Sequence, residues 1–285
     1  MDSRNIRKIS YYYLLLIPII SAGLGFGVGP VSYQIYLPLW LVNVVLMLIA
    51  SWQIGLKFIK KNSLESTHLA VLSFFLVAPW LFISIFAGMG PPPESGPAWV
   101  ANITEQQVRY SFLVVCGVLI VLGFGGISEI LKKRGESFYS KISFVAISVA
   151  IPLFIINMLF WGFYLSQYFK IKIETSQLDH PEWFTPIREL FGMISIVEVA
   201  LTYLATLTMS IALKNVGWLS SNSAKAYQIL SSLALVVIIS SPIFPEFLQI
   251  PGFALSIPAI PFIMPFYLGL NLLWKVGTDT IRSIN

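Results

Sequence analysis

The stretch ISFVAISVAIPLFIINMLFWGFYL, residues 142–165, contains no charged side chain over 24 positions. A helix needs about 20 mostly apolar residues to cross the hydrocarbon core of a bilayer, because each residue advances the helix axis by about 1.5 Å. This stretch is long enough to cross a membrane, and no charge opposes its insertion. It therefore predicts a transmembrane helix.

Seven further stretches have the same apolar character. Short segments that carry charges, or that are rich in proline and glycine, separate them. The fold class is accordingly all-α, a polytopic transmembrane helix bundle of about eight spans. Residues 1–285 are expected to form a single integral membrane domain, with no soluble domain. The predicted spans are 10–29, 36–56, 68–90, 107–131, 142–165, 190–213, 226–247 and 251–274.

The composition excludes most classes of soluble protein. Apolar residues make up 56% of the chain and charged residues only 11%, with a mean hydropathy of +0.80. An ordinary soluble domain has about 25% charged residues, so this chain cannot cover a buried core with polar side chains. A soluble enzyme, a disordered protein and a nucleic-acid-binding domain are excluded. The expected partner is the lipid bilayer, and no nucleic acid.

The basic residues indicate the orientation in the membrane. With the N-terminus in the cytoplasm, 14 of the 18 Lys and Arg residues fall on the cytoplasmic side. Basic residues accumulate in short cytoplasmic loops, so this split also explains the net charge of +5 without an anionic partner. We expect both termini in the cytoplasm and the chain in the cell (inner or plasma) membrane. The remaining four, on the outer side, are Arg109, Lys170, Lys172 and Arg188.

The two ends of the chain leave alternatives open. Residues 10–29 also fit a cleaved secretory signal, although the stretch reaches spanning length and no A-x-A cleavage pattern follows it. Six prolines fall within residues 242–265. Proline removes a backbone donor and clashes with the preceding turn, so we expect helices seven and eight to be kinked or broken. A re-entrant segment in this region is the alternative to two full spans.

A weak internal repeat divides the chain into halves 1–135 and 136–285. Lys8-Ile9-Ser10 opens the first span and Lys141-Ile142-Ser143 opens the fifth, and a proline follows in each, Pro18 or Pro152. Four spans in each half make a 4+4 parallel repeat, an arrangement found in transporters. Matches this short also arise by chance, which is the alternative.

Glu198 is the most informative single residue, because it is predicted well inside the sixth span. A carboxylate there costs on the order of 3 kcal/mol on insertion scales, so it is a functional candidate by default. No lysine or arginine is expected deep enough to pair with it, and burial without a cation favours the neutral, protonated carboxyl. Glu198 is therefore a candidate site for a proton, a cation or a substrate.

A polar stripe extends along the same helix face as Glu198. At 100° per residue, Ser195, Thr202 and Thr206 fall on the same side of the sixth span. One interpretation is the wall of a hydrated pathway that leads past Glu198. The alternative is helix packing, because Ser and Thr let helices approach closely and form hydrogen bonds across the contact.

Three further polar residues complete the candidate site. Asn43 in the second span and Asn157 in the fifth are predicted near mid-membrane, where either one can hydrogen-bond Glu198 or line the same cavity. Glu246 follows Pro245 near the outer end of the seventh span, where the free backbone groups of a broken helix help to bind ions or substrates. The alternatives are interhelical ties for the two asparagines and an ordinary interfacial carboxylate for Glu246.

Three functions are compatible with these features of the sequence. No catalytic set and no metal-binding motif is recognisable in the sequence, and the cofactor is left unknown. A transporter or ion-coupled permease for a small solute is favoured by Glu198, its polar stripe and the proline-rich last helices. One alternative is a non-catalytic membrane subunit of a larger complex, such as an energy-converting one. The other is a membrane enzyme acting on a lipid or polyprenyl substrate. The first reading allows a homo-oligomer, and the second requires partner membrane subunits.

Overall fold

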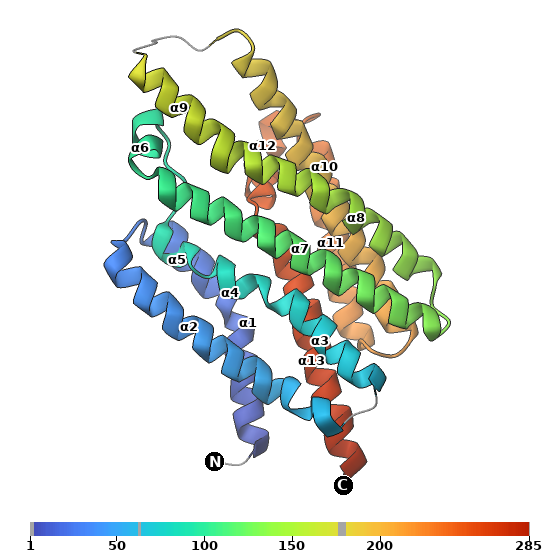
Figure 1. Ribbon diagram of the computed structural model, residues 1–285. Coiled ribbons are helices and arrows are strands. Elements are labelled where there is room, and N and C mark those ends of the chain that lie inside the picture. The colour runs from blue at the N-terminus through green and yellow to red at the C-terminus, as the bar shows by residue number, and fades with distance from the viewer. Residues whose placement is uncertain (1–2, 62–63, 176–180, 285) are drawn as a thin grey trace.

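The computed structural model describes residues 3–61, 64–175 and 181–284, and within these ranges the fold is entirely helical (Figure 1). Eight helical segments of the described residues are long and apolar enough to cross a membrane. The chain is thus an integral membrane protein with the predicted number of spans. The helices are α1 (Ser3–Gly27), α2 (Tyr33–Ile54), η1 (Leu56–Lys61), α3 (Leu64–Val77), α4 (Pro79–Ile83), α5 (Phe86–Met89), α6 (Gly96–Ala101), α7 (Ile103–Lys133), α8 (Phe138–Leu159), η2 (Phe160–Tyr164), α9 (Leu165–Glu174), α10 (Phe184–Asn215), α11 (Ser221–Ser240), α12 (Pro245–Ser256), η3 (Ile260–Phe262) and α13 (Ile263–Ile284).

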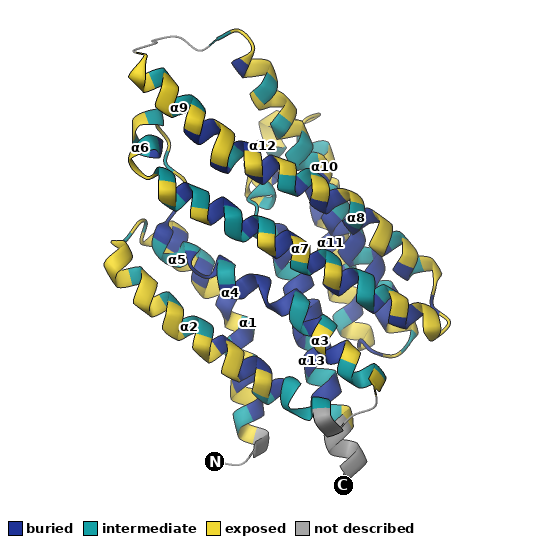
Figure 2. Ribbon diagram, in the orientation of Figure 1, coloured by how far each residue is buried: buried dark blue, intermediate teal, exposed yellow. Residues whose placement is uncertain are grey.

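The spanning segments differ in how deeply they lie in the bundle. In the third span, Leu64–Met89, 67% of the most apolar window is buried, whereas the share is 17% in α2. The third span packs against α13 and α7, while α2 packs mainly against α1 and is coloured largely as exposed in Figure 2. Large apolar side chains such as Leu39 and Val42 of α2 are exposed. A continuous apolar surface of this kind is stable when lipid covers it.

The third predicted span is divided into several helices in the structure. The third span, predicted as residues 68–90, consists of α3, α4 and α5, and Pro79 is the first residue of α4. Pro79 lacks the N–H that would continue the hydrogen bonding of α3, which explains why a new helix begins there. A break in this span was not predicted.

The last two spans are shifted relative to the predicted ranges 226–247 and 251–274. The structure has spanning segments at Ser221–Ser240 and Ile260–Asp279, with the short helix α12 between them. Prolines lie at both junctions. Pro242 follows α11, and Pro258 lies between α12 and η3. Part of each predicted span therefore belongs to α12 instead of a crossing helix.

The fifth span contains one turn of π-helix. Helix α8 continues through η2 into α9 without a break, over Phe138–Glu174. The π turn holds Gly162, where an added Cβ would lie 2.5 Å from the Cβ of Tyr110 in α7. Only glycine allows this approach. Trp99 stacks on Tyr110, with ring centroids 6.3 Å apart, and its Nε1 donates to Ser166 of α9. The Tyr110 ring is thus fixed in place.

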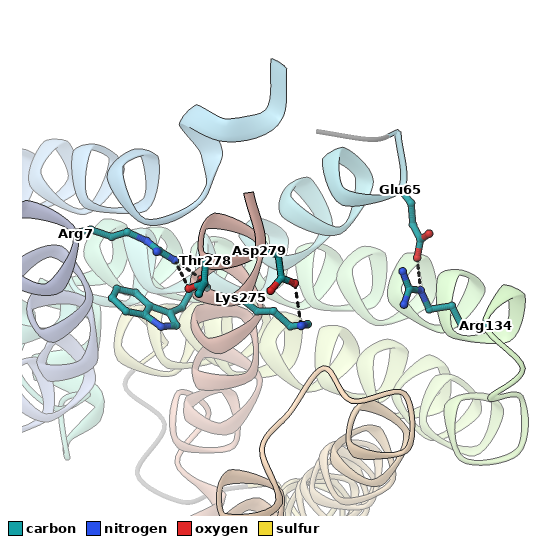
Figure 3. A network of polar contacts seen from close by, with 7 residues as sticks. Arg7, Glu65, Arg134, Lys275, Thr278 and Asp279 are labelled. Carbon is teal, nitrogen blue, oxygen red and sulfur yellow. Dashed lines mark hydrogen bonds and ion pairs between the residues drawn. The ribbon is translucent and has the colours of Figure 1, made fainter. Parts of the chain in front are cut away.

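Arg7 joins three helices at the end of the bundle where the described chain begins and ends (Figures 1 and 3). Its Nε donates to the carbonyl of Ile54, the last residue of α2, at 3.0 Å. Its Nη2 donates to the Trp274 carbonyl and, at 2.9 Å, to Thr278 Oγ1 in α13. The guanidinium also lies over the Trp274 ring, 4.1 Å from its centroid. Figure 3 further shows the ion pairs Lys275–Asp279 and Arg134–Glu65.

Candidate functional site

Glu198 lies near the middle of the long helix α10, as the fifteenth of its 32 residues. The side chain is only 2% exposed. Helix α8 packs along α10, and Asn157 of α8 is also 2% exposed. The Asn157 Nδ2 donates to Glu198 Oε1 at 3.0 Å. The structure therefore joins two of the residues predicted for the site, across the contact between the fifth and sixth spans.

Half of this polar pair has no partner. Glu198 Oε2 and Asn157 Oδ1 are both buried and make no hydrogen bond with any described residue. No cation of the described part of the chain forms an ion pair with Glu198. Buried polar atoms without partners are uncommon in native proteins, because each has lost its hydrogen bonds to water. The Glu198–Asn157 pair can therefore bind a proton, a cation or another hydrogen-bond donor that the described residues do not supply.

The threonine hydroxyls of the polar stripe donate to backbone carbonyls of α10 itself. Thr202 Oγ1 donates to the Glu198 carbonyl at 2.8 Å, and Thr206 Oγ1 donates to the Thr202 carbonyl at 3.0 Å. Ser143 of α8 donates across the contact to the Ala205 carbonyl at 2.7 Å. Ser195, one turn before Glu198, is only partly buried. This pattern is the one expected of close helix packing.

The other two predicted residues lie elsewhere. Asn43 of α2 accepts a hydrogen bond at its Oδ1 from the Tyr13 hydroxyl of α1, at 2.6 Å. It ties the first two spans together and makes no hydrogen bond to Glu198. Glu246 is exposed in the first turn of α12. An acidic residue there interacts favourably with the positive end of the helix dipole.

Sequence reasoning missed the burial of Arg109. Its position near the start of the fourth predicted span led it to be counted with the outer loops. In the structure its side chain is 5% exposed, and its Nε has no partner among the described residues. The available signal was the charge itself, two positions inside the predicted span 107–131 and next to Tyr110.

No protein-family model matches the chain, and no curated protein or solved structure matches it.

Proposed function

We propose that this integral membrane protein is an ion-coupled permease for a small solute, with Glu198 as the site of the coupling proton. The observation that carries the proposal is the unpaired half of the Glu198–Asn157 pair. In the ionised form, both unpaired atoms are hydrogen-bond acceptors, so neither one can satisfy the other. A proton on Glu198 Oε2 provides the donor that Asn157 Oδ1 lacks.

The surroundings of Glu198 support a role in proton exchange. Near the bilayer midplane, a carboxyl group without a cation is stable only in its neutral form, and intramembrane carboxyls form the proton sites of pumps and transporters. Helix α10 also contacts α12 and η3, the short elements that interrupt the end of the bundle. A shift of these elements is the proposed route by which water reaches Glu198 and the proton leaves.

We propose the cell (inner or plasma) membrane and cytoplasmic termini for this permease. Arg7 and Arg109 are buried in the bundle and do not belong to the loops that set orientation. Without them, 13 basic residues remain on the proposed cytoplasmic side and three on the outer side. The bias is preserved, as the positive-inside rule requires. The 4+4 repeat stays a prediction.

Proton-coupled flux in vesicles tests the proposed function. The purified full chain is reconstituted into liposomes that contain a pH-sensitive dye, and a panel of sugars, amino acids, organic cations and organic anions is added outside. We expect at least one solute to drive proton movement, and Glu198→Gln to abolish that movement with unchanged reconstitution. Glu246→Gln, a change of an exposed carboxylate, is the matched control and keeps the flux.

Three results would contradict this proposal. Equal flux in Glu198→Gln and in the unchanged protein would remove Glu198 from the mechanism. Stoichiometric partner proteins, found by native mass spectrometry after gentle extraction from the native membrane, would instead favour the subunit of a larger complex. Catalytic turnover of a lipid or polyprenyl substrate in detergent, where no gradient exists, would favour the enzyme.

A further inference from the structure

A cavity lies at the opposite end of the bundle from Arg7, separate from Glu198 and Asn157. Its walls come from α1, α4, α5, α7 and the segment that joins α12 to η3. The cavity volume is about 100 Å³. This volume is below the about 300–1,000 Å³ of typical small-molecule sites, so the cavity accommodates only part of a larger ligand. Among the lining residues, Ala22, Phe26, Leu113 and Ile257 are apolar.

Arg109 is the one charged residue of this cavity wall. Its Nη2 donates to the carbonyls of Gly90, at 2.8 Å, and Met89, at 3.4 Å. The buried Nε has no partner among the described residues, and no described carboxylate forms an ion pair with the guanidinium. The nearest acidic residue along α7, Glu105, accepts a hydrogen bond from Tyr36 and acts on the guanidinium through its charge without forming an ion pair. The guanidinium also lies 5.2 Å from the centroid of the Phe86 ring. Among the described residues, Arg109 thus has no carboxylate in direct contact.

The same face of α7 carries two further polar groups. Tyr110, next to Arg109, lines the cavity and is held by Gly162 and Trp99. Gln106, one turn before Tyr110, has a buried Oε1 without a partner among the described residues but is not part of the cavity wall. Apart from Ser21, the rest of the wall is apolar. One end of the cavity therefore fits an anionic or hydrogen-bonding head, and the remainder fits a hydrocarbon chain.

The depth of Arg109 in the membrane matches that of a lipid headgroup. Helix α7 has 31 residues and is about 46 Å long, whereas the hydrocarbon core is about 30 Å thick. A helix centred in the bilayer therefore extends about 8 Å beyond the hydrocarbon at each end. Arg109 follows the first residue of α7 by six positions, or about 9 Å. It lies at the edge of the hydrocarbon, where the phosphate of a lipid is within reach of its side chain.

We infer that this cavity binds an anionic membrane lipid, with its phosphate on Arg109 and Tyr110 and its acyl chain against Ala22, Leu113 and Ile257. Three observations support this occupant: the unpaired Nε of Arg109, the apolar walls and the depth of the site. The exposed residues Phe26, Pro91 and Pro92 line the mouth, so a lipid can enter from the bilayer. The inference does not depend on proton binding by Glu198.

Native mass spectrometry of the delipidated full chain tests the inference. The chain is titrated with phosphatidylglycerol and with phosphatidylcholine of the same acyl chains, and separately with inorganic phosphate. We expect one tightly bound phosphatidylglycerol, at least about tenfold tighter than phosphatidylcholine, because phosphatidylcholine has the same ionised phosphate but also a choline cation that the guanidinium repels. Arg109→Gln removes this preference. Arg188→Gln, a change of an exposed arginine that the same count places on the same side, keeps it.

A second variant covers the case in which Arg109→Gln fails to fold. Ala22→Phe fills the apolar part of the cavity and leaves Arg109 in place, so we expect it to lose the bound phosphatidylglycerol. Equal affinity for the two lipids, or equal losses in Arg109→Gln and Arg188→Gln, would overturn the inference. Saturable binding of inorganic phosphate that phosphatidylglycerol does not displace would also overturn it, because the ligand would then be a water-soluble anion.

Discussion

Arg7 and Arg109 are buried arginines at opposite ends of the same bundle, and they differ in how completely their donors are used. Arg7 donates to two backbone carbonyls and a threonine hydroxyl, and it stacks on Trp274. Arg109 lies over the Phe86 ring at the longer distance of 5.2 Å, donates through Nη2 alone to two carbonyls and keeps an unpaired Nε. The first arginine is satisfied by the chain itself, whereas the second has capacity left for a ligand.

This difference distinguishes a charge that stabilises the fold, a structural charge, from a charge that is available to a ligand, a binding charge. Burial of an arginine costs several kcal/mol unless its donors are paired, so a protein that keeps one buried must pair it within the fold or with a ligand. Arg7 is paired within the fold, whereas Arg109 and Glu198 are paired within the fold only in part. The three residues therefore predict different consequences when each is replaced.

The largest effect is expected from Arg7→Gln. Glutamine is too short to reach α2 and α13 together, so buried carbonyls lose their donor, and the stacking on Trp274 is lost. We expect a loss of about 3 kcal/mol in the free energy of unfolding. Cys116, fully buried and the only cysteine, reports the loss as earlier reaction with a fluorogenic maleimide on heating. Lys8→Gln, at an exposed neighbouring position, is the control, and an equal change in both variants would contradict the role of Arg7.

A smaller effect is expected from Asn157→Leu. This change removes the one hydrogen-bond partner of the Glu198 carboxyl among the described residues and leaves it unpaired, at a cost of about 2 kcal/mol. Replacing both residues with leucine removes both polar groups together, so the double variant is expected to recover most of the loss. The same thermal assay measures all three proteins. A double variant that is less stable than Asn157→Leu alone would show that the two residues do not act as a pair.

The sequence predicted the architecture better than it predicted the site. Apolar length fixes a spanning helix almost by itself, which is why all eight crossings were found. The boundaries failed where proline divides an apolar stretch, because residues 226–274 are apolar in the crossing helices and in α12 alike. Hydropathy measures the side chains and is insensitive to the backbone donor that Pro79, Pro242 and Pro258 lack.

The candidate site shows the same limit for contacts between helices. The period of 3.6 residues placed Thr202 and Thr206 beside Glu198, but it carries no information on which helix faces them. Asn43 and Asn157 were equivalent in the sequence, and only the packing of α8 against α10 distinguishes them. Arg109 was missed because its depth depends on where α7 enters the membrane. Because α7 begins at Ile103, Arg109 lies inside the bundle.

Lipid-dependent stability sharpens the comparison between the two arginines. A ligand that binds only the folded state at ten times its Kd stabilises that state by about 1.4 kcal/mol. We expect phosphatidylglycerol to raise the Tm of the unchanged protein and of Arg7→Gln by similar amounts. Arg109→Gln should show no such rise. A lipid effect that disappears in Arg7→Gln and persists in Arg109→Gln would reverse the assignment of the structural and binding charges.

The smallest effect on stability is expected from Glu198→Gln. Glutamine has nearly the shape of a protonated glutamic acid, and its amide can accept from Asn157 Nδ2 while donating to Asn157 Oδ1. If Glu198 is protonated in the resting protein, as its lack of a cation requires, the change preserves every hydrogen bond and shifts the free energy of unfolding by less than about 0.5 kcal/mol. The thermal assay on Cys116 measures this. A loss as large as that of Asn157→Leu would show that Glu198 carries a charge stabilised by a partner outside the pair. Near-unchanged stability together with abolished proton flux separates the proton site from the packing contact that surrounds it.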